Sequence, residues 1–272
     1  MKPIIRDEKT GIMYREWKAA SPKAALLLVH GLGASSERWD FMGEYFAANS
    51  VSCYALELKG FGGADGRRGD ISSFGVYERD ITSLLEIIRR DNSGIKVFLA
   101  GESMGALLSF MMIASVSRAF DGLICISPAF ASRLKFSLPA YVMMAFAYIF
   151  RPGRYFLMPF DPEMCTRDRE YSKTMDVGHS GNRLVTARML AHILFAQIRA
   201  PFAARAVNAG VLFVVAGHDS IVDPAASKRV FENIGSADKT ILLYPEMYHA
   251  LSVELGREKV FADILGWINK RI

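Results

Sequence analysis

The chain has 272 residues, of which 51% are hydrophobic, and it carries a formal net charge of +5. This length and apolar content provide for a large buried core and exclude intrinsic disorder. The basic residues are scattered in ones and twos, so the charge suits anionic surfaces or substrates and argues against a nucleic-acid partner.

The termini and apolar stretches bear on the compartment. Charged residues recur within residues 2–9, so no signal-peptide stretch fits there. The longest uncharged stretch, residues 136–150, is shorter than the roughly 18 to 20 residues that cross a bilayer, and Pro139 interrupts it. Three widely spaced cysteines indicate reduced thiols. We therefore predict a cytoplasmic protein.

Short apolar runs alternate with helical patterns along the chain. The predicted strands are residues 11–18, 25–31, 51–58, 96–101, 122–127, 211–217 and 240–245. The predicted helices between and after them are residues 73–90, 225–234 and 257–272. Buried, β-branched strands followed by glycine or polar turns are typical of parallel sheets. The pattern predicts an α/β fold with a mostly parallel open sheet and helices on both faces.

Residues 131–209 interrupt this alternation. They contain no clear strand, and the predicted helices over residues 138–150 and 182–200 are joined by a loop with proline and glycine. Long excursions from a compact domain are usually functional. We interpret this segment as a helical cap or lid inserted into a core formed by residues 1–130 and 210–272.

A serine stands at the end of one predicted strand, in the sequence Gly101-Glu102-Ser103-Met104-Gly105. A helix is expected to begin near Ala106. Glycines two positions on either side of a serine permit a tight strand-to-helix elbow that exposes the hydroxyl, and the helix N-terminus adds partial positive charge. The pattern indicates a nucleophile, although a glycine turn without function would have the same sequence.

A serine nucleophile needs a base and an acid that orients the base. Of the five histidines, His249 alone follows the last predicted strand, where a loop would return over the sheet edge; by itself it could equally be a surface or capping histidine. The others are His30, His179, His192 and His218.

Two aspartates follow the preceding strand and compete for the role of the acid. Asp219 comes directly after the strand, whereas Asp223 stands before Pro224 in the position of a helix N-cap. We select Asp219. The resulting order, serine then aspartate then histidine, is the order used by α/β-hydrolases.

An acyl-transfer site also needs two N–H groups for the oxyanion. The backbone amide of Met104 is one candidate, and the amide of Leu32, in the glycine-rich sequence after residues 25–31, is the other. His30 is expected to support this loop through hydrogen bonds. A glycine turn would explain the loop alone nearly as well.

These segments resemble those of the serine α/β-hydrolases, within them the monoacylglycerol lipase and lysophospholipase group, over nearly the whole chain. VHGLGASSERW is similar to the oxyanion loop, GESMGA to the nucleophile elbow, MPFDPEMCTRDRE to the lid signature, and AGHDSIVDP with YPEMYHAL to the acid and base segments. The resemblance implies Ser103 as nucleophile, Asp219 as acid and His249 as base, with the Leu32 and Met104 amides as oxyanion hole. Glu102 departs from the group, where histidine is frequent.

The resemblance implies a serine carboxylester hydrolase acting on a small-molecule acyl ester of lipid type. Four residues of the insert are candidates for substrate contact: Tyr141, Met144, Ile149 and Met158. With basic residues at its flanks, the insert could also rest on a membrane or micelle surface, which would make the protein peripheral. Alternatively, the insert helix merely packs on the core.

Other functions stay open on the sequence. The same residues could serve a short-chain esterase, a thioesterase or an acyltransferase; a non-catalytic binding fold or a membrane-interaction protein is the remaining alternative. We predict no metal or nucleotide cofactor, because metal-ligand spacing, a phosphate-binding loop and a dinucleotide fingerprint are all missing from the sequence.

Overall fold

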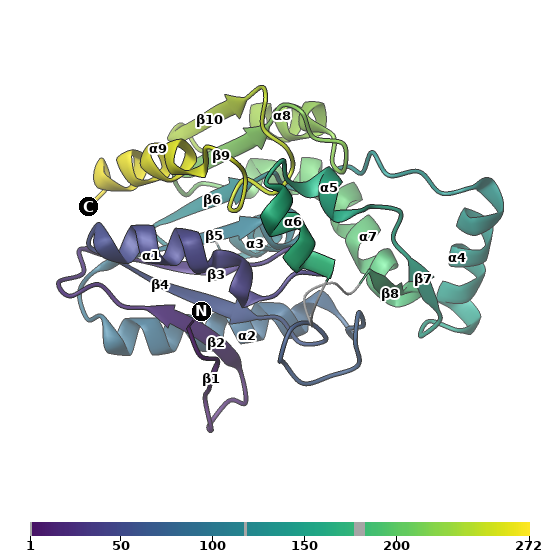
Figure 1. Cartoon of the computed structure of the whole chain (residues 1–272), viewed down its shortest axis with the longest axis horizontal. Coiled ribbons are helices and arrows are strands. Elements are labelled where there is room, and N and C mark those ends of the chain that lie inside the picture. Colours follow the sequence, from purple (N-terminus) through teal and green to yellow (C-terminus); the bar gives the residue numbers. More distant parts are fainter. Residues whose placement is uncertain (1, 117–118, 177–182) are drawn as a thin grey trace.

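An eight-stranded sheet forms the centre of the computed structural model, which describes residues 2–116, 119–176 and 183–272 (Figure 1). Strands β1 and β2 join the sheet in antiparallel fashion, and all the other neighbours are parallel. The predicted mostly parallel sheet is therefore confirmed. In sheet order, the strands are β1 (Ile5–Arg6), β2 (Met13–Trp17), β4 (Val51–Glu57), β3 (Ala24–Val29), β5 (Lys96–Glu102), β6 (Gly122–Ile126), β9 (Val211–Ala216) and β10 (Lys239–Tyr244).

Helices cover both faces of this sheet. On one face, α1 (Asp40–Ala48) and α9 (Arg257–Asn269) bury Phe46, Phe261 and Trp267 against the strands. On the other face lie α2 (Phe74–Asp91), α3 (Met104–Ser115) and α8 (Pro224–Glu232). Because both faces are covered, every residue of β3 and of β4 is buried, including the polar Ser52 and Glu57 of β4.

The parallel strands bring distant parts of the chain to one edge of the sheet. Val29 at the end of β3 is in register with Gly101 of β5, and Glu102 is in register with Ile126 of β6. The loops that follow β3, β5, β6, β9 and β10 therefore emerge side by side, which is where ligands bind in open α/β sheets.

The insert, residues 131–209, lies between β6 and β9, and its helix α4 stands out at the end of the molecule opposite the C-terminus (Figure 1). It contains α4 (Leu138–Phe150), β7 (Tyr155–Leu157), α5 (Pro162–Cys165), α6 (Arg169–Asp176), β8 (Leu184–Thr186), α7 (Ala187–Ala203) and a short 3-10 helix, η2 (Ala204–Ala206). Within the described ranges, no helix combines the length and apolar character needed to cross a membrane. The division into core and cap remains a prediction.

Two sequence predictions for the insert need correction. The expectation of no strand is wrong, because β7 and β8 pair in antiparallel fashion; strands of three residues carry too little alternation to be recognised. The second predicted helix begins at Ala187, where the Thr186 hydroxyl caps it by accepting a hydrogen bond from the Met189 N–H at 3.2 Å. Its predicted start, Asn182, lies outside the described residues.

The glycine- and arginine-containing loop after β4 anchors the insert to the core. The buried carboxylate of Asp70 accepts a hydrogen bond from Thr186 Oγ1 at 2.7 Å. It also forms an ion pair with Arg188, whose Nη2 lies 2.5 Å from Oδ2. The Gly69 carbonyl accepts from the Thr186 N–H at 3.0 Å. A Cβ at Gly69 would lie 2.0 Å from the Leu184 carbonyl oxygen, so this approach requires glycine.

Candidate active site

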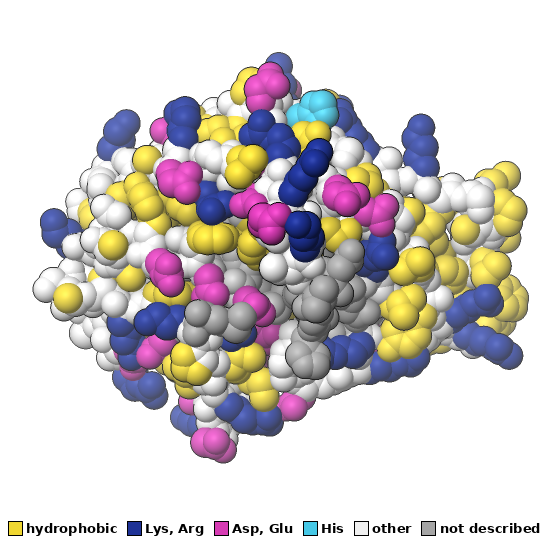
Figure 2. All heavy atoms as spheres, in the orientation of Figure 1, with side chains coloured by type: hydrophobic (Ala, Val, Ile, Leu, Met, Phe, Trp, Pro, Cys, Tyr) yellow, Lys and Arg dark blue, Asp and Glu magenta, His cyan; other side chains and the backbone are white. Residues whose placement is uncertain are grey.

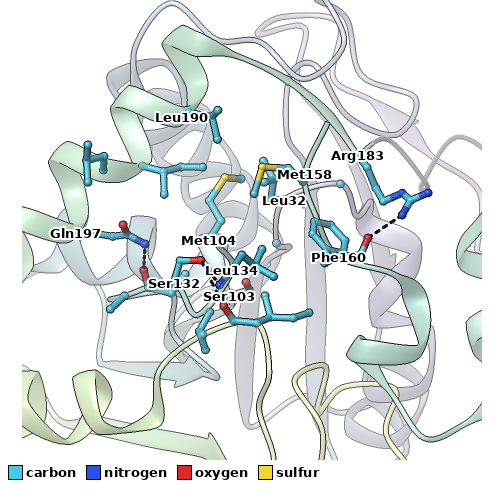
Figure 3. A pocket seen from close by; sticks show the side chains of 18 of the residues that line it. Leu32, Ser103, Met104, Ser132, Leu134, Met158, Phe160, Arg183, Leu190 and Gln197 are labelled. Atoms are coloured by element: carbon cyan, nitrogen blue, oxygen red, sulfur yellow. Dashed lines mark hydrogen bonds between the residues drawn. The ribbon is translucent and has the colours of Figure 1, made fainter. Parts of the chain in front are cut away.

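Ser103 occupies the sharp turn between β5 and α3. Its backbone has φ 58° and ψ −119°, a conformation that costs a non-glycine residue about 1–3 kcal/mol. Hydrogen bonds hold it there: the Ser103 N–H donates to the Ile126 carbonyl at 2.9 Å, and its carbonyl accepts from Leu107 and Ala129, each at 3.1 Å. The sequence-predicted elbow is present at this position, and its side chain lies among those that line a pocket (Figure 3).

Gly105 lets the elbow pack directly on strand β3. A Cβ at this position would lie 2.1 Å from the carbonyl oxygen of Val29 and 2.6 Å from that of His30. Helix and strand can approach this closely only because residue 105 has no side chain. The elbow and the loop after β3 are therefore held against each other.

Asp219 and His249 form a buried pair at the same edge of the sheet. Asp219 follows β9 and His249 follows β10, and Asp219 Oδ2 lies 2.7 Å from His249 Nδ1. The other carboxylate oxygen accepts from the backbone N–H groups of Ile221 and Val222, each at 2.9 Å. An ionised carboxylate only accepts, so His249 Nδ1 carries a proton, and in the neutral imidazole Nε2 keeps its lone pair.

Burial and charge shift both members of this pair. Burial raises the pKa of Asp219, but the charge of His249 and the hydrogen bonds hold that pKa below its ordinary value. Burial lowers the pKa of His249, whereas the charge and hydrogen bond of Asp219 outweigh burial and raise it above its ordinary value. The competing candidate, Asp223, instead accepts from the Ala225 N–H at 3.1 Å as the N-cap of α8.

The loop after β3 lies against the serine. Gly31 is so near that a Cβ there would be 3.0 Å from Ser103 Cβ, and Leu32 and Met104 line the pocket with Ser103. His30 is fully buried behind this loop: its Nε2 accepts from the Leu58 N–H at 3.1 Å, and its Nδ1 donates to the Gly31 carbonyl at 2.9 Å. Burial lowers the pKa of His30, consistent with this neutral tautomer.

A cavity of about 800 Å³ connects these residues with the insert. Its volume lies in the upper part of the range for small-molecule pockets, about 300–1,000 Å³. Both Ser103 and His249 line it, and so do all four substrate-contact candidates, which are Tyr141, Met144, Ile149 and Met158. Figure 3 shows Met158 and Leu190 on the side of the pocket facing Ser103. Its lining is mainly apolar.

Polar residues that sequence reasoning did not select also line the cavity. Arg38 and Glu102 lie beside the serine, and Gln197 and Arg183 come from the insert. Gln197 donates to the Ala129 carbonyl at 2.9 Å and Arg183 to the Phe160 carbonyl at 2.8 Å (Figure 3). Arg38 lies within the segment VHGLGASSERW that resembles an oxyanion loop, and this position could have identified it from the sequence. Gln197 has none, because its placement depends on how α7 packs.

The remaining histidines lie elsewhere. His192 Nε2 contacts the Ser72 carbonyl at 3.0 Å, and His218 stacks on Tyr248. His179 lies outside the described residues. In the described parts of the chain, no group of three or more His, Cys, Asp or Glu side chains is arranged to hold a metal ion.

The strand order, the strained serine after β5 and the acid–base pair after β9 and β10 define the α/β-hydrolase class. A model of the Hydrolase_4 family, described as serine aminopeptidase, S33, matches residues 20–256. The chain belongs to this family.

Relatives with known structures or names extend over nearly the whole chain. Monoglyceride lipase of Rattus norvegicus is 26% identical over 276 residues, covering 99% of this chain and 90% of the relative. Monoacylglycerol lipase of Mycolicibacterium smegmatis is 25% identical, covering 94% and 92%. The crystal structure of Paleococcus ferrophilus monoacylglycerol lipase superimposes with a TM-score of 0.87 at 24% identity, covering 96% and 99%. The predicted α/β-hydrolase fold and enzyme class, a carboxylic ester hydrolase similar to monoacylglycerol lipases, are confirmed.

Proposed function

We propose that the protein hydrolyses lipid esters with a single acyl chain, of the monoacylglycerol or lysophospholipid type, through an acyl-enzyme on Ser103. The observation that carries the proposal is the shared cavity: Ser103 and the Asp219-bound His249 line one mainly apolar space of about 800 Å³. The names of the relatives, which are monoglyceride and monoacylglycerol lipases, support the substrate class.

The proposed reaction uses the protonation state of the buried pair. Asp219 accepts a hydrogen bond from the Nδ1–H of His249, so Nε2 takes the proton of Ser103 as the serine oxygen attacks the ester carbonyl. The backbone N–H groups of Leu32 and Met104 receive the developing oxyanion, a contribution of about 3 kcal/mol for one donor. His249 then returns the proton to the departing alcohol, and water repeats the sequence on the acyl-enzyme.

The insert serves as the lid of the acyl site in this proposal. Its helix α4 contributes Tyr141, Met144 and Ile149 to the cavity, and Met158 follows from the next segment. The flexible thioether side chains of Met144 and Met158 can adapt to a hydrocarbon chain. We therefore expect medium or long acyl chains to be preferred over acetyl.

We further propose that the outward face of α4 contacts the lipid surface from which the substrate comes. Leu138, Val142, Phe146 and Phe150 are exposed by 76%, 64%, 56% and 65%. Lys135, Arg151 and Arg154 are exposed beside them, and Figure 2 shows hydrophobic and basic side chains gathered at this end of the molecule. An apolar face bordered by cations suits an anionic lipid interface. Arg133, the other basic residue at this flank, donates to the Asp219 carbonyl at 2.6 Å and so is also engaged with the core.

Hydrolysis of p-nitrophenyl esters from acetyl to palmitoyl, beside a monoacylglycerol, a lysophospholipid and an acyl thioester, tests the reaction. An aminoacyl p-nitroanilide is included because the family description names an aminopeptidase. We expect the longer esters to be preferred and Ser103→Ala to abolish turnover. Equal turnover by Ser103→Ala, or none by the wild type, would refute the proposal; a preference for acetyl or for thioesters would reassign the substrate.

Sedimentation with phosphatidylglycerol-containing vesicles tests the surface contact. Ser103→Ala should bind as the wild type does, whereas Val142→Asp and Phe146→Asp should weaken binding about tenfold or more, because each places a charge in the apolar interface. Leu255→Asp is the matched control, since Leu255 is exposed by 48% outside the insert. Equal losses in all three Asp variants would contradict the assignment of this face.

A further inference from the structure

A buried carboxylate precedes the nucleophile in the chain. Glu102 is the last residue of β5, it is exposed by only 2%, and it lines the cavity beside Ser103. Its Oε1 accepts a hydrogen bond from the Ser252 N–H at 3.0 Å, and its Oε2 accepts from Ser252 Oγ at 2.9 Å. Arg38 Nη1 lies 3.5 Å from the same Oε2. Three donors thus surround a group that the proposed reaction does not use.

The partner of Glu102 belongs to the segment that carries the base. Ser252 lies in the loop after β10, shortly after His249, and the intervening Leu251 N–H donates to the His249 carbonyl at 3.1 Å. Both carboxylate oxygens of Glu102 therefore hold this loop against the end of β5. Ser103 is the next residue in the chain after Glu102. The carboxylate thus joins the segment of the nucleophile to the segment of the base.

We infer that Glu102 is a positioning residue for the proposed hydrolysis: its carboxylate fixes the His249 loop against the Ser103 elbow and, with Arg38 as counter-ion, balances the charge around the imidazole. The inference rests on the proposed function, because only that reaction requires Ser103 and His249 to be held together.

The charges around His249 predict the direction in which its pKa should change when Glu102 or Arg38 is removed. Burial lowers the pKa of His249 and Asp219 raises it; Glu102 raises it further, whereas Arg38 lowers it. The nearby Cys165 adds no charge, because burial raises the pKa of its thiol to about 12. Removing Glu102 therefore lowers the pH at which His249 becomes the neutral base, and removing Arg38 raises it.

The experiment measures kcat/KM on a p-nitrophenyl ester from about pH 5 to about pH 9, together with thermal unfolding. We call the rise of kcat/KM on the acidic side of this pH profile the acid limb. Glu102→Gln keeps the shape of the side chain and should shift the acid limb to lower pH by about half a unit or more. Arg38→Met should move it up by a similar amount, and the double variant should return toward the wild type. Glu254→Gln is the control: it is a buried carboxylate in the same loop, held by Arg167 and the Tyr248 N–H, and it should leave the limb in place.

A further variant separates the hydrogen bond between Ser252 and Glu102 from the charge of the Glu102 carboxylate. Ser252→Ala removes one of the two bonds to Glu102 and keeps the carboxylate. We expect kcat to fall about three- to tenfold, with the acid limb unmoved. A purely structural role of Glu102 would lower thermal stability in both variants and leave the acid limb of Glu102→Gln in place, and an unchanged kcat in Ser252→Ala would contradict a positioning role for the bond from Ser252.

The possible failures are distinguishable. If Ser103→Ala is as active as the wild type, the proposed function fails. If Ser103→Ala is inactive but the limbs of Glu102→Gln, Arg38→Met and the wild type coincide, the inference about Glu102 is overturned and the proposed function stands. Movement of both single-variant limbs in the same direction would also overturn it.

Discussion

Substituting Gly105 by alanine tests how the elbow depends on close packing. A Cβ at residue 105 would lie 2.1 Å from the Val29 carbonyl oxygen, whereas ordinary contact begins near 3.4 Å. Helix α3 and strand β3 must therefore separate by about 1.3 Å. Both contacts are with backbone atoms, so no flexible side chain can yield instead.

Two magnitudes follow from this separation. Overpacking of this kind costs about 1–3 kcal/mol of the free energy of unfolding, partly offset because alanine favours a helix by about 1 kcal/mol over glycine. The larger effect is on the reaction, because the loop with Leu32 moves away from Ser103. A misplacement of about 1 Å at a reacting centre costs about a hundredfold in rate, and we expect kcat/KM to fall by that amount.

The assay combines ester hydrolysis with urea unfolding followed by circular dichroism. Gly266→Ala is the matched control: Gly266 lies in α9, and a Cβ there would meet nothing within 4 Å. This variant should gain about 0.5–1 kcal/mol and keep its activity. The packing argument would be refuted by a Gly105→Ala protein with both kcat/KM and unfolding midpoint near those of the wild type.

Four further outcomes are expected. Asp219→Asn should lower kcat by about 10⁴-fold on the same ester, because the imidazole loses the acceptor that fixes its tautomer. Because the pKa of His249 is raised, the kcat/KM of the wild type should increase with pH and reach half its maximum above about pH 6.5. Asp70→Asn should lower the free energy of unfolding by about 1–3 kcal/mol through weakened contacts with Arg188. Since these contacts outweigh burial and hold the pKa of Asp70 below its ordinary value, the difference from the wild type in urea should be full above about pH 4 and shrink as the pH falls through that lowered pKa. Asp223→Ala should cost about 1 kcal/mol in urea unfolding, as loss of an N-cap does, with kcat/KM unchanged.

Local patterns were sufficient to predict most of the fold. The helix Leu138–Phe150 was predicted with the observed bounds, since Pro139 fits the first turn of a helix and Arg151 follows an unbroken apolar stretch. The continuous apolar sequences of β3, β5 and β9 identified buried parallel strands. Because β5, β9 and β10 end at one edge of the sheet, Ser103, Asp219 and His249 were expected near one another from the sequence alone.

Features that depend on distant pairing were not accessible to the same reasoning. Glu102 and Ser252 are 150 positions apart, and Asp70 and Arg188 are 118 apart. Neither pair has a local pattern, because each contact exists only after the loops have been brought together. Strands β7 and β8 were missed because three residues in each carry too little alternation and their pairing partners lie far apart in the chain.

The arrangement of strands has a consequence for how activity appears during folding. Ser103 and the loop with Leu32 belong to the first half of the chain, whereas Asp219 and His249 come after β9 and β10. A ribosome releases the N-terminal part first, so the nucleophile emerges well before its base. In a refolding time course, ester turnover would lag behind helix formation and report specifically the docking of β9 on β6, which closes a long loop in the chain, and of β10 on β9.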